Sequence, residues 1–227
     1  DMASNLQTQI TRLEQLSRVQ QRFVSDVSHE LRTPLTTVRM AADVLYEARE
    51  TDQFDPATAR SAELLQNQLD RFESLLTDLL EISRFDAGAA VLDADPVDLR
   101  VLAERAVEAA APLAERKKTL VRLTTPDEVC LVEADARRID RVLRNLVVNA
   151  IEHGEGRPVD VAVACGDGAA AVAVRDHGVG LKPGESSLVF NRFWRADPAR
   201  ARTTGGTGLG LSISLEDVRL HGGWLQA

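Results

Sequence analysis

Three things are scarce in this sequence, and each scarcity excludes a class of protein. Cys130 and Cys165 are the only cysteines, and they lack both a Cys-x-x-Cys arrangement and a histidine at metal-ligand spacing. We therefore expect two buried, reduced thiols and no disulfide framework or zinc site. The formal net charge of −8 argues against a general nucleic-acid binder, because phosphate backbones attract a cationic surface. No apolar run approaches the roughly 20 residues that cross a bilayer, and the first residues do not resemble a signal peptide.

The composition itself is that of a globular protein. Of the 227 residues, 44% are apolar and 27% are charged, which suits one large domain or two small ones. No internal repeat or low-complexity tract is present. The sequence starts at Asp1 inside a helical pattern and stops at Ala227 just after a new strand begins, so we expect a piece of a longer protein, truncated at the C-terminus.

The first part of the chain has the pattern of a helical hairpin. From Met2 to about Ala48, apolar residues recur every three or four positions, which predicts one long amphipathic helix. The pattern restarts at "FDPATARSAELL", where Asp55 suits an N-cap and Pro56 the first helical position, and runs to the "DAG" at 86–88. Such a hairpin buries one face of each helix, so we expect a second copy to complete a four-helix bundle. Packing on the C-terminal domain of the same chain is the alternative.

The second part alternates between strand and helix patterns. Short apolar runs predict strands at 119–123, 129–133, 158–164 and 169–175. Helical patterns lie between them at 98–115, 135–152 and 208–221. This mixture indicates a sheet with helices on one face, a two-layer α/β sandwich. The glycine-rich, polar stretch at 177–207 is long for a connection, which is typical of a functional lid or a disordered segment.

Three stretches of this second part have residues suited to a nucleotide. In "RNLVVNAIEH", Asn145 and Asn149 share one helix face, and amide oxygens are suitable ligands for Mg²⁺; a solvated helix face is the alternative. In "AVAVRDHGVG", Asp176 ends a strand and can accept a hydrogen bond from an exocyclic amine, while Gly178 and Gly180 permit close approach of a flat ring. An ordinary Asp-Gly turn is the alternative there.

The third stretch is "TTGGTGLGLSIS", in which a glycine-rich loop opens a helix. Free N–H groups at a helix start bind phosphate, although "ARARTT" before the loop, in place of a strand, excludes a dinucleotide-binding fingerprint. Upstream, "FNRFWRADPARAR" combines aromatic residues with arginines. Arg195, Arg200 and Arg202 are suited to polyphosphate, and Phe190, Phe193 and Trp194 to docking a lid. A purely structural loop is the alternative.

Residues 25–35, "SDVSHELRTPL", place a proline inside a helical pattern. The ring of Pro34 presses on the carbonyl of Glu30, next to His29, at a cost of roughly 3 kcal/mol. Strain confined to one spot is a reason to look for chemistry there.

Taken in order, these stretches resemble sensor histidine kinases. The asparagine helix, the strand-end aspartate, the aromatic segment and the glycine-rich loop are similar to the N, G1, F and G2 boxes of their ATP-binding domain. "SHELRTPL" resembles their H box, the hairpin their dimerisation and phosphotransfer (HisKA) domain, and "NLQTQITRLEQLSRVQQ" the end of a HAMP linker. "SRVQQRFVSDVSHELRTPLTTVRMAADVL" and "GGTGLGLSIS" are most similar to one actinobacterial type of sensor kinase. Together the resemblance covers nearly the entire chain.

The resemblance implies an α+β fold class, in which a dimeric hairpin bundle precedes an α/β two-layer sandwich of the Bergerat (GHKL) type. It divides the chain into the end of a HAMP linker at 1–16, the phosphotransfer hairpin at 17–86 and the catalytic ATP-binding domain at 87–227. It also implies the cytoplasmic portion of a plasma-membrane sensor.

The resemblance also assigns catalytic roles. His29 becomes the phosphoacceptor, whose neutral Nε2 attacks the γ-phosphate of ATP; imidazole titrates near pH 6.5 in general, so this form is abundant. Glu30 accepts the Nδ1 proton as a general base. Thr33 helps to position water for dephosphorylation of the partner, and Pro34 allows local movement around His29.

The implied cofactors are ATP and Mg²⁺, with Asn149 as metal ligand and Asn145 as its helper. Two positions depart from the family pattern. Glu152 stands where a basic residue is usual, and we expect it to point away from the phosphates; His177 stands where asparagine is common. His153 takes an aromatic position and can stack on the base. The expected nucleotide-binding residues are Asn145, Asn149, His153, Asp176, Gly178, Gly180, Phe190, Arg195, Arg202, Gly206, Thr207, Gly208, Leu209 and Gly210.

The implied reaction is autophosphorylation of His29, transfer of the phosphoryl group to an aspartate of a response regulator, and dephosphorylation of that regulator. The implied partners are a second copy of the chain and the regulator, a DNA-binding transcription factor, with no direct contact to nucleic acid. Two rivals stay open: a clamp-type ATPase of the gyrase and Hsp90 group, and an ATP-binding scaffold or phosphatase-dominated form with little autokinase activity.

Overall fold

The computed structural model describes residues 35–46, 55–86, 88–166, 168–195 and 207–227. The expected HAMP end, most of the first hairpin helix and the stretch around the kink therefore lie outside the described residues. The chain divides into two units, Asp1–Ala90 and Val91–Ala227, which we describe separately. Among the described residues, no helix has both the length and the apolar character needed to span a membrane.

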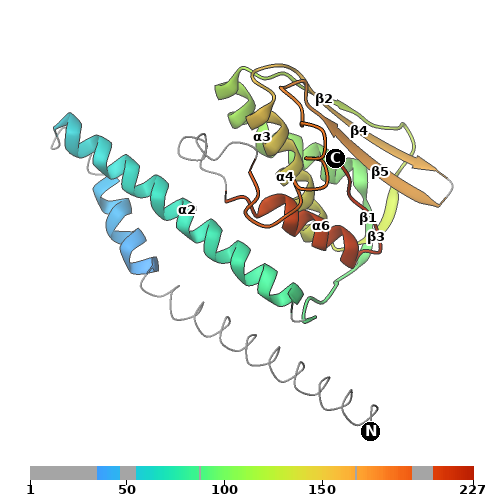
Figure 1. Cartoon of the computed structure of the whole chain (residues 1–227), viewed down its shortest axis with the longest axis horizontal. Helices are drawn as coiled ribbons and strands as arrows, with labels where there is room; N and C mark the ends of the chain where they lie inside the picture. The colour runs from blue at the N-terminus through green and yellow to red at the C-terminus, as the bar shows by residue number, and fades with distance from the viewer. Residues whose placement is uncertain (1–34, 47–54, 87, 167, 196–206) are drawn as a thin grey trace, which may run out of the picture. The chain divides into compact units, whose positions relative to one another are not determined.

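The first unit contains an antiparallel pair of helices, formed by residues 35–46 and by α2 (Pro56–Asp86) (Figure 1). Asp55 caps α2, because its Oδ1 accepts hydrogen bonds from the backbone N–H groups of Ala57 at 2.9 Å and Thr58 at 3.2 Å. Both the predicted N-cap and the predicted first helical residue, Pro56, are confirmed. The N-cap satisfies donors that the first turn of a helix leaves unpaired.

A small apolar core and an ion pair join the two helices of this unit. Leu35, Ala42 and Leu69 are buried against one another. The Nη1 atom of Arg39 lies 2.7 Å from Oδ1 of Asp70 and 2.6 Å from Oε2 of Glu73. Many large apolar side chains of the pair nevertheless stay exposed: Val38, Met40, Val44, Leu45, Leu64, Leu65, Phe72 and Leu79. The pair therefore buries only part of its apolar surface by itself.

The second unit is an α/β domain with two small sheets. Its strands are β1 (Asp95–Asp98), β2 (Val121–Thr124), β3 (Leu131–Ala134), β4 (Val159–Gly166) and β5 (Ala169–Arg175). Its helices are α3 (Leu99–Lys117), α4 (Ala136–His153) and α6 (Gly210–Leu220). The larger sheet has the order β2-β4-β5, with β2 parallel and β5 antiparallel to β4, and β1 pairs with β3 in the antiparallel sense.

The larger sheet has one buried and one exposed face. Along β4, Val159, Val161 and Val163 are buried, whereas Ala162, between the last two valines, and Ala164, after them, are exposed. The buried valines pack against α3 and α4, which lie over the same face of the sheet (Figure 1). Period-two burial of this kind is what a sheet covered on one side requires. The predicted two-layer sandwich is confirmed.

Local signals explain where α3 and α4 begin. Asp98 caps α3 by accepting from the N–H of Arg100 at 3.1 Å, and Asp135 caps α4 by accepting from the N–H groups of Arg137 and Arg138 at 3.0 and 3.3 Å. The predicted helix and strand ranges agree with those of the structure to within about two residues. The missed element is β1, whose sequence "DPVD" has poor strand propensity and becomes a strand by pairing with β3.

The cysteines differ from expectation. Cys130 and Cys165 form a disulfide, with their Cα atoms 5.9 Å apart. Cys130 is buried, but Cys165 is exposed, so the prediction of two buried, reduced thiols is wrong. The reason is tertiary: Cys130 precedes β3 and Cys165 lies near the end of β4, and folding brings together two positions that are 35 residues apart in the chain.

Candidate nucleotide-binding site

The two asparagines of α4 lie at the edge of the domain core. On the opposite side of the helix, Val142, Leu143 and Val147 are buried, which turns the partly exposed Asn145 and Asn149 away from the sheet. The Nδ2 of Asn145 donates to the carbonyl of Gly210 at 3.2 Å and to the hydroxyl of Ser214 at 3.3 Å. Within the described residues, the side chain of Asn149 makes no hydrogen bond.

The glycine-rich loop meets Asn145 at the start of α6. Gly210 is the first residue of that helix, and a Cβ at this position would lie 3.4 Å from the side chain of Asn145. Leu209 precedes it, is buried, and provides no side-chain cap. Thr207 accepts from the N–H of Leu209 at 3.2 Å. The first amides of α6 therefore have no side-chain cap among the described residues, which suits a helix start that receives an anion.

The loop after β5 packs against the other end of α4. A Cβ on Gly178 would lie 2.1 Å from the backbone carbonyl oxygen of His153, so no other residue fits here without a shift of the backbone. Asp176 is exposed, and its Oδ1 accepts from the N–H of Gly178 at 2.8 Å. Gly180 has a φ of +71°, which favours glycine. This loop thus carries Asp176 to the C-terminal end of α4.

His177 holds the same loop to the start of β4. Its Nδ1 lies 3.0 Å from the carbonyl oxygen of Pro158, and the backbone carbonyl of His177 accepts from Arg157 at 2.8 Å. A carbonyl can only accept, so Nδ1 carries the proton. His177 therefore has a structural role here. The sequence, in which His177 stands where the family commonly has asparagine, did not indicate this role.

The aromatic segment connects directly to the glycine-rich loop. The N–H of Phe193 donates to the carbonyl of Gly208 at 2.9 Å. Gly208 has a φ of +73°, and a Cβ there would lie 3.1 Å from the Cα of Phe193, so the contact requires glycine. Phe190 is half-buried, whereas Phe193 is exposed. Within the described residues 177–195, no helix or strand is present, in agreement with the predicted irregular stretch.

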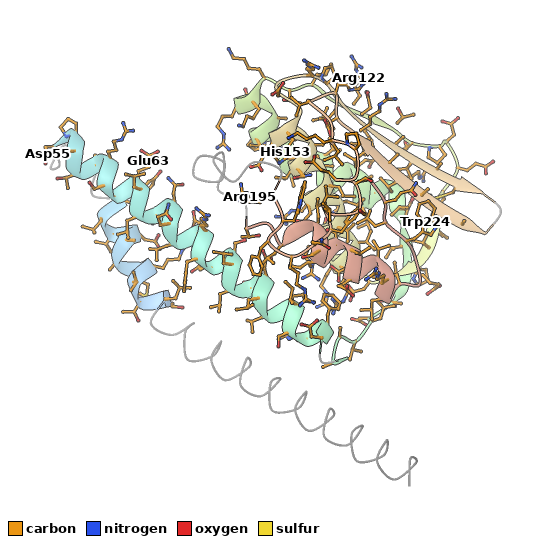
Figure 2. The ribbon with its side chains drawn as sticks, viewed as in Figure 1. Asp55, Glu63, Arg122, His153, Arg195 and Trp224 are labelled. Atoms are coloured by element: carbon orange, nitrogen blue, oxygen red, sulfur yellow. A yellow bond between two sulfur atoms is a disulfide. The ribbon has the colours of Figure 1, made fainter. Side chains whose placement is uncertain are left out.

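Glu152, in the last turn of α4, is half-buried. Burial raises the pKa of its carboxyl group, and the positive charges of His153, Lys117 and Arg195 act in the opposite direction. His153 and Arg195 (Figure 2) are both expected nucleotide-binding residues. The acidic side chain therefore lies among positive charges at this end of the domain, and the expectation that it points away from the phosphates stays a prediction.

The structure brings together the asparagine helix, the loop after β5, the aromatic segment and the glycine-rich loop. The expected residues His29, Glu30, Thr33, Arg202 and Gly206 lie outside the described residues. Within the described part of the chain, no group of three or more His, Cys, Asp or Glu side chains could hold a metal ion.

The donors present do fit ATP with Mg²⁺. The Oδ1 atom of Asn145 is not used by the bonds that its Nδ2 makes, and Asn149 has an unengaged amide group among the described residues. Mg²⁺ takes few protein oxygens and completes its shell with waters and phosphate oxygens. The amides at the start of α6, which no described side chain caps, are of the kind that suits a phosphate.

The sequence did not predict one polar contact, which joins α4 to α6. Asp217 is fully buried, and Arg138 and Arg141 bind its two oxygens. The signal was available in part, because Arg138, Arg141 and Asn145 recur at helical spacing and an aspartate interrupts the apolar face of α6. The sequence alone does not indicate that the arginine face of α4 contacts the aspartate face of α6.

Comparison with known proteins agrees with this geometry. Residues 19–88 match the His Kinase A (phospho-acceptor) domain, and residues 134–227 match the histidine kinase-, DNA gyrase B-, and HSP90-like ATPase. The chain therefore contains a phospho-acceptor domain of the histidine kinase type, and its second unit contains an ATPase domain of the histidine kinase, gyrase and HSP90 type.

The chain is similar to sensor histidine kinase MtrB. It is 56% identical to MtrB of Mycolicibacterium paratuberculosis and 55% identical to MtrB of Mycobacterium tuberculosis, in each case over the whole chain and 40% of the relative. It is 34% identical to sensor histidine kinase WalK of Bacillus subtilis, over 94% of the chain and 35% of the relative. The narrower actinobacterial resemblance is confirmed. The chain spans about two fifths of the length of the MtrB relatives.

Two solved structures have related architecture. Full-length ShkA, determined in complex with AMPPNP, has a TM-score of 0.72 and 27% identity, over 89% of this chain and 42% of that one. The histidine kinase AdeS of Acinetobacter baumannii has a TM-score of 0.59 and 22% identity, over 85% of this chain and 86% of that one; this second likeness concerns the fold alone.

Proposed function

We propose that this chain is the catalytic part of a sensor histidine kinase, which transfers the γ-phosphate of ATP to His29 and from there to an aspartate of a response regulator. The observation that carries the proposal is that the glycine-rich loop and the loop after β5 both contact α4, and that the aromatic segment contacts the glycine-rich loop. Asn145 binds Gly210, Gly178 packs on His153, and Phe193 binds Gly208.

We further propose that Asn149 and Asn145 hold Mg²⁺ and that Asp176 binds the adenine amine. Gly178, Gly180, His153 and Phe190 would shape the base pocket, and Arg195, Arg202 and the 206–210 loop (Gly206, Thr207, Gly208, Leu209 and Gly210) would bind the phosphates. The uncapped start of α6 supports the phosphate assignment. The cation, when bound, neutralises charge that develops on the phosphate oxygens. Placement and charge neutralisation supply most of the gain in phosphoryl transfer.

In the proposed reaction, the neutral Nε2 of His29 forms a bond to the γ-phosphorus while the bond from that phosphorus to ADP breaks. Glu30 accepts the proton of Nδ1, which keeps the ring a good nucleophile. Thr33, four residues after His29 in the sequence, positions water when the phosphorylated regulator is hydrolysed. The kink expected at Pro34 supports movement around His29.

We propose three segments: the end of a HAMP linker at 1–16, the phosphotransfer hairpin at 17–86 and the catalytic domain at 87–227. The exposed apolar side chains on α2, such as Leu65, Phe72 and Leu79, support pairing of two hairpins in a homodimeric bundle. The regulator, a DNA-binding transcription factor, would dock on that bundle. We also propose that the chain is the cytoplasmic portion of a membrane sensor, in keeping with a relative named as a sensor histidine kinase.

The test uses ATP labelled either at the γ or at the α position. The purified chain is incubated with each form and Mg²⁺, and the label bound to protein is examined for stability in acid and base. A phosphohistidine is acid-labile and base-stable, so we expect such label from γ-labelled ATP only, and none in His29→Gln.

Other outcomes identify the rivals. Steady phosphate release from a protein that never becomes labelled would indicate a clamp-type ATPase. Nucleotide binding with neither label nor phosphate release would indicate a scaffold or phosphatase-dominated form. Asn149→Ala should reduce labelling strongly, and restoration of the signal at raised Mg²⁺ would support its role as metal ligand.

A further inference from the structure

A row of polar groups runs along the contact between α4 and α6. On α4 they are spaced by three and four residues, and from the start of α6 to its C-cap they are spaced by four, three and four, so each set occupies one helix face. We call this row the α4–α6 seam; it consists of Arg138, Arg141, Asn145, Gly210, Ser214, Asp217 and His221.

Asp217 is the centre of the seam and is fully buried. Its Oδ1 accepts from Nη1 of Arg138 at 2.8 Å, and its Oδ2 accepts from Nε and Nη2 of Arg141 at 2.9 and 2.6 Å. Both carboxylate oxygens are therefore held by charge-assisted hydrogen bonds from α4. The two arginine side chains are 15% and 30% exposed, so the whole cluster is largely removed from water.

His221 closes the C-terminal end of the seam. The backbone N–H of Asp135, the N-cap of α4, lies 3.0 Å from Nε2 of His221 and donates to it. Nε2 is therefore unprotonated, and Nδ1 carries the hydrogen that it donates to the backbone carbonyl of Asp217 at 2.7 Å. The end of α6 is in this way tied to the start of α4.

Asn145 closes the other end of the seam, at the candidate nucleotide site. It binds the carbonyl of Gly210 and the hydroxyl of Ser214, which is fully buried. Gly210 and Asp217 are about two helical turns apart on α6. The charge cluster and the nucleotide end of α4 thus belong to one continuous contact between the two helices.

A buried ion cluster of this kind adds little net stability compared with apolar side chains of the same size, but it strongly penalises any other arrangement. Sliding α6 along α4 by one turn, about 5.4 Å, would take Asp217 away from Arg138 and Arg141. The charge would then be buried without a partner. An apolar contact would tolerate such a slip far better.

The register of this contact matters because α6 begins at the glycine-rich loop. We propose that Asp217, held by Arg138 and Arg141, is a positioning residue for the nucleotide. It fixes the register of α6 on α4 and so sets the distance between the amides at the start of α6 and the amide groups of Asn145 and Asn149. The inference rests on the proposed function in taking this end of α4 as the nucleotide site.

The decisive variant replaces the charge cluster by apolar side chains, as Arg138→Met, Arg141→Leu and Asp217→Leu together. Because well-packed apolar groups often replace buried ion clusters without loss of stability, we expect the thermal midpoint to be maintained or raised. The dissociation constant of the whole chain for ATP with Mg²⁺, measured by calorimetry, should rise by about tenfold or more, as for other groups that orient ligand-binding residues. A role in stability alone would leave this constant unchanged.

Two further variants sharpen the result. Asp217→Asn with Arg138→Gln and Arg141→Gln keeps side chains that can hydrogen-bond at all three positions without their charges, and it should restore most of the affinity because the register is kept. Arg100→Leu is the matched control: it breaks a partly buried ion pair with Asp98 in the same domain, away from α6. It should lower the thermal midpoint without changing the dissociation constant.

The side-chain NMR signal of Asn145 reports the register independently of nucleotide. It should shift in the apolar variant and stay close to its wild-type position in Asp217→Asn/Arg138→Gln/Arg141→Gln and in Arg100→Leu. An apolar variant that is folded, keeps the Asn145 signal and binds ATP within about twofold of wild type would overturn the inference. A folded wild-type chain that binds no ATP would instead overturn the proposed function, and the Asn145 signal would still decide whether Asp217 sets the register.

Discussion

The side-chain amide of Asn145 donates a hydrogen bond to the backbone carbonyl of Gly210, 3.2 Å away and 65 residues later in the chain. The bond uses the nitrogen of the amide and leaves its oxygen as an acceptor. One residue can therefore link the asparagine helix to the glycine-rich loop and also serve a metal ion. A substitution at Asn145 will change both the loop position and the ligand set, so Asn149 is the cleaner position for testing metal binding.

Gly178→Ala should damage the domain where the loop after β5 meets α4. The added Cβ would lie 2.1 Å from the carbonyl oxygen of His153, which belongs to the backbone and cannot rotate away. Overpacking typically costs about 1–3 kcal/mol, and we expect a loss of this size in urea unfolding, together with weaker ATP binding. Gly166→Ala is the control, because nothing lies within 4 Å of its Cβ. Equal stability of the two variants would contradict the close contact seen here.

Glu152→Gln should stabilise the protein at neutral pH. Burial raises the pKa of Glu152, although His153, Lys117 and Arg195 oppose the shift. A raised folded-state pKa means that the favourable contribution is present below the ordinary glutamate pKa and is lost as the pH rises through the folded-state value. Glutamine removes the cost of the buried charge, so the thermal midpoint should rise at pH 7 and match wild type near about pH 4.

The exposed Glu108→Gln is the control for this comparison. Nucleotide titration of the same pair tests the direction of the Glu152 side chain. If it faces the phosphates, Glu152→Gln will bind ATP more tightly than wild type; if it points away, the affinities will agree. A lower midpoint at pH 7 would show that attraction to Arg195 and Lys117 outweighs the cost of burial.

Asp98→Asn should flatten the acid limb of the stability profile. The hydrogen bond from Arg100 lowers the pKa of Asp98 most, burial acts in the opposite direction, and the N–H groups of Arg100 and Cys130 add to the lowering. A lowered folded-state pKa gives stability that is present above the ordinary aspartate pKa, about 3.9, and is lost as the pH falls through the folded-state value.

Asparagine does not titrate and still accepts a hydrogen bond as the N-cap of α3. The variant should therefore be less stable than wild type at pH 7, and the difference should shrink as the pH falls below about 4. Thermal denaturation across this range measures it. Asp95→Asn, at an exposed position of β1, should follow the wild-type profile; if it flattens the acid limb equally, the effect does not come from Asp98.

The disulfide should stabilise the second unit. It joins Cys130, before β3, to Cys165, near the end of β4, and the two cysteines are 35 positions apart in sequence. Closing a loop of this size typically contributes about 2–4 kcal/mol. A reductant should lower the thermal midpoint of wild type. Cys165→Ser should have this lowered midpoint both with and without reductant. Thiol titration in denaturant without reductant should detect none in wild type; two reactive thiols would contradict the bond.

Part of this architecture follows from short-range patterns. The cap at Asp55, the start of α2 at Pro56 and the ranges of α3, α4 and α6 were predicted because caps and helical spacing act within a few residues. The alternating strand of β4 was predicted for the same reason. The approach failed at β1, where "DPVD" has no strand pattern and the partner β3 supplies the order.

By itself, the sequence determined the local elements, the order of the nucleotide motifs and the family. Only the tertiary structure decided which positions meet: Cys130 with Cys165, Gly178 with His153, and Asp217 with Arg138, which is 79 residues away. The physical reason is range, because helix caps and spacing depend on neighbours along the chain. A buried carboxylate finds its two guanidinium groups only after two helices have packed side by side.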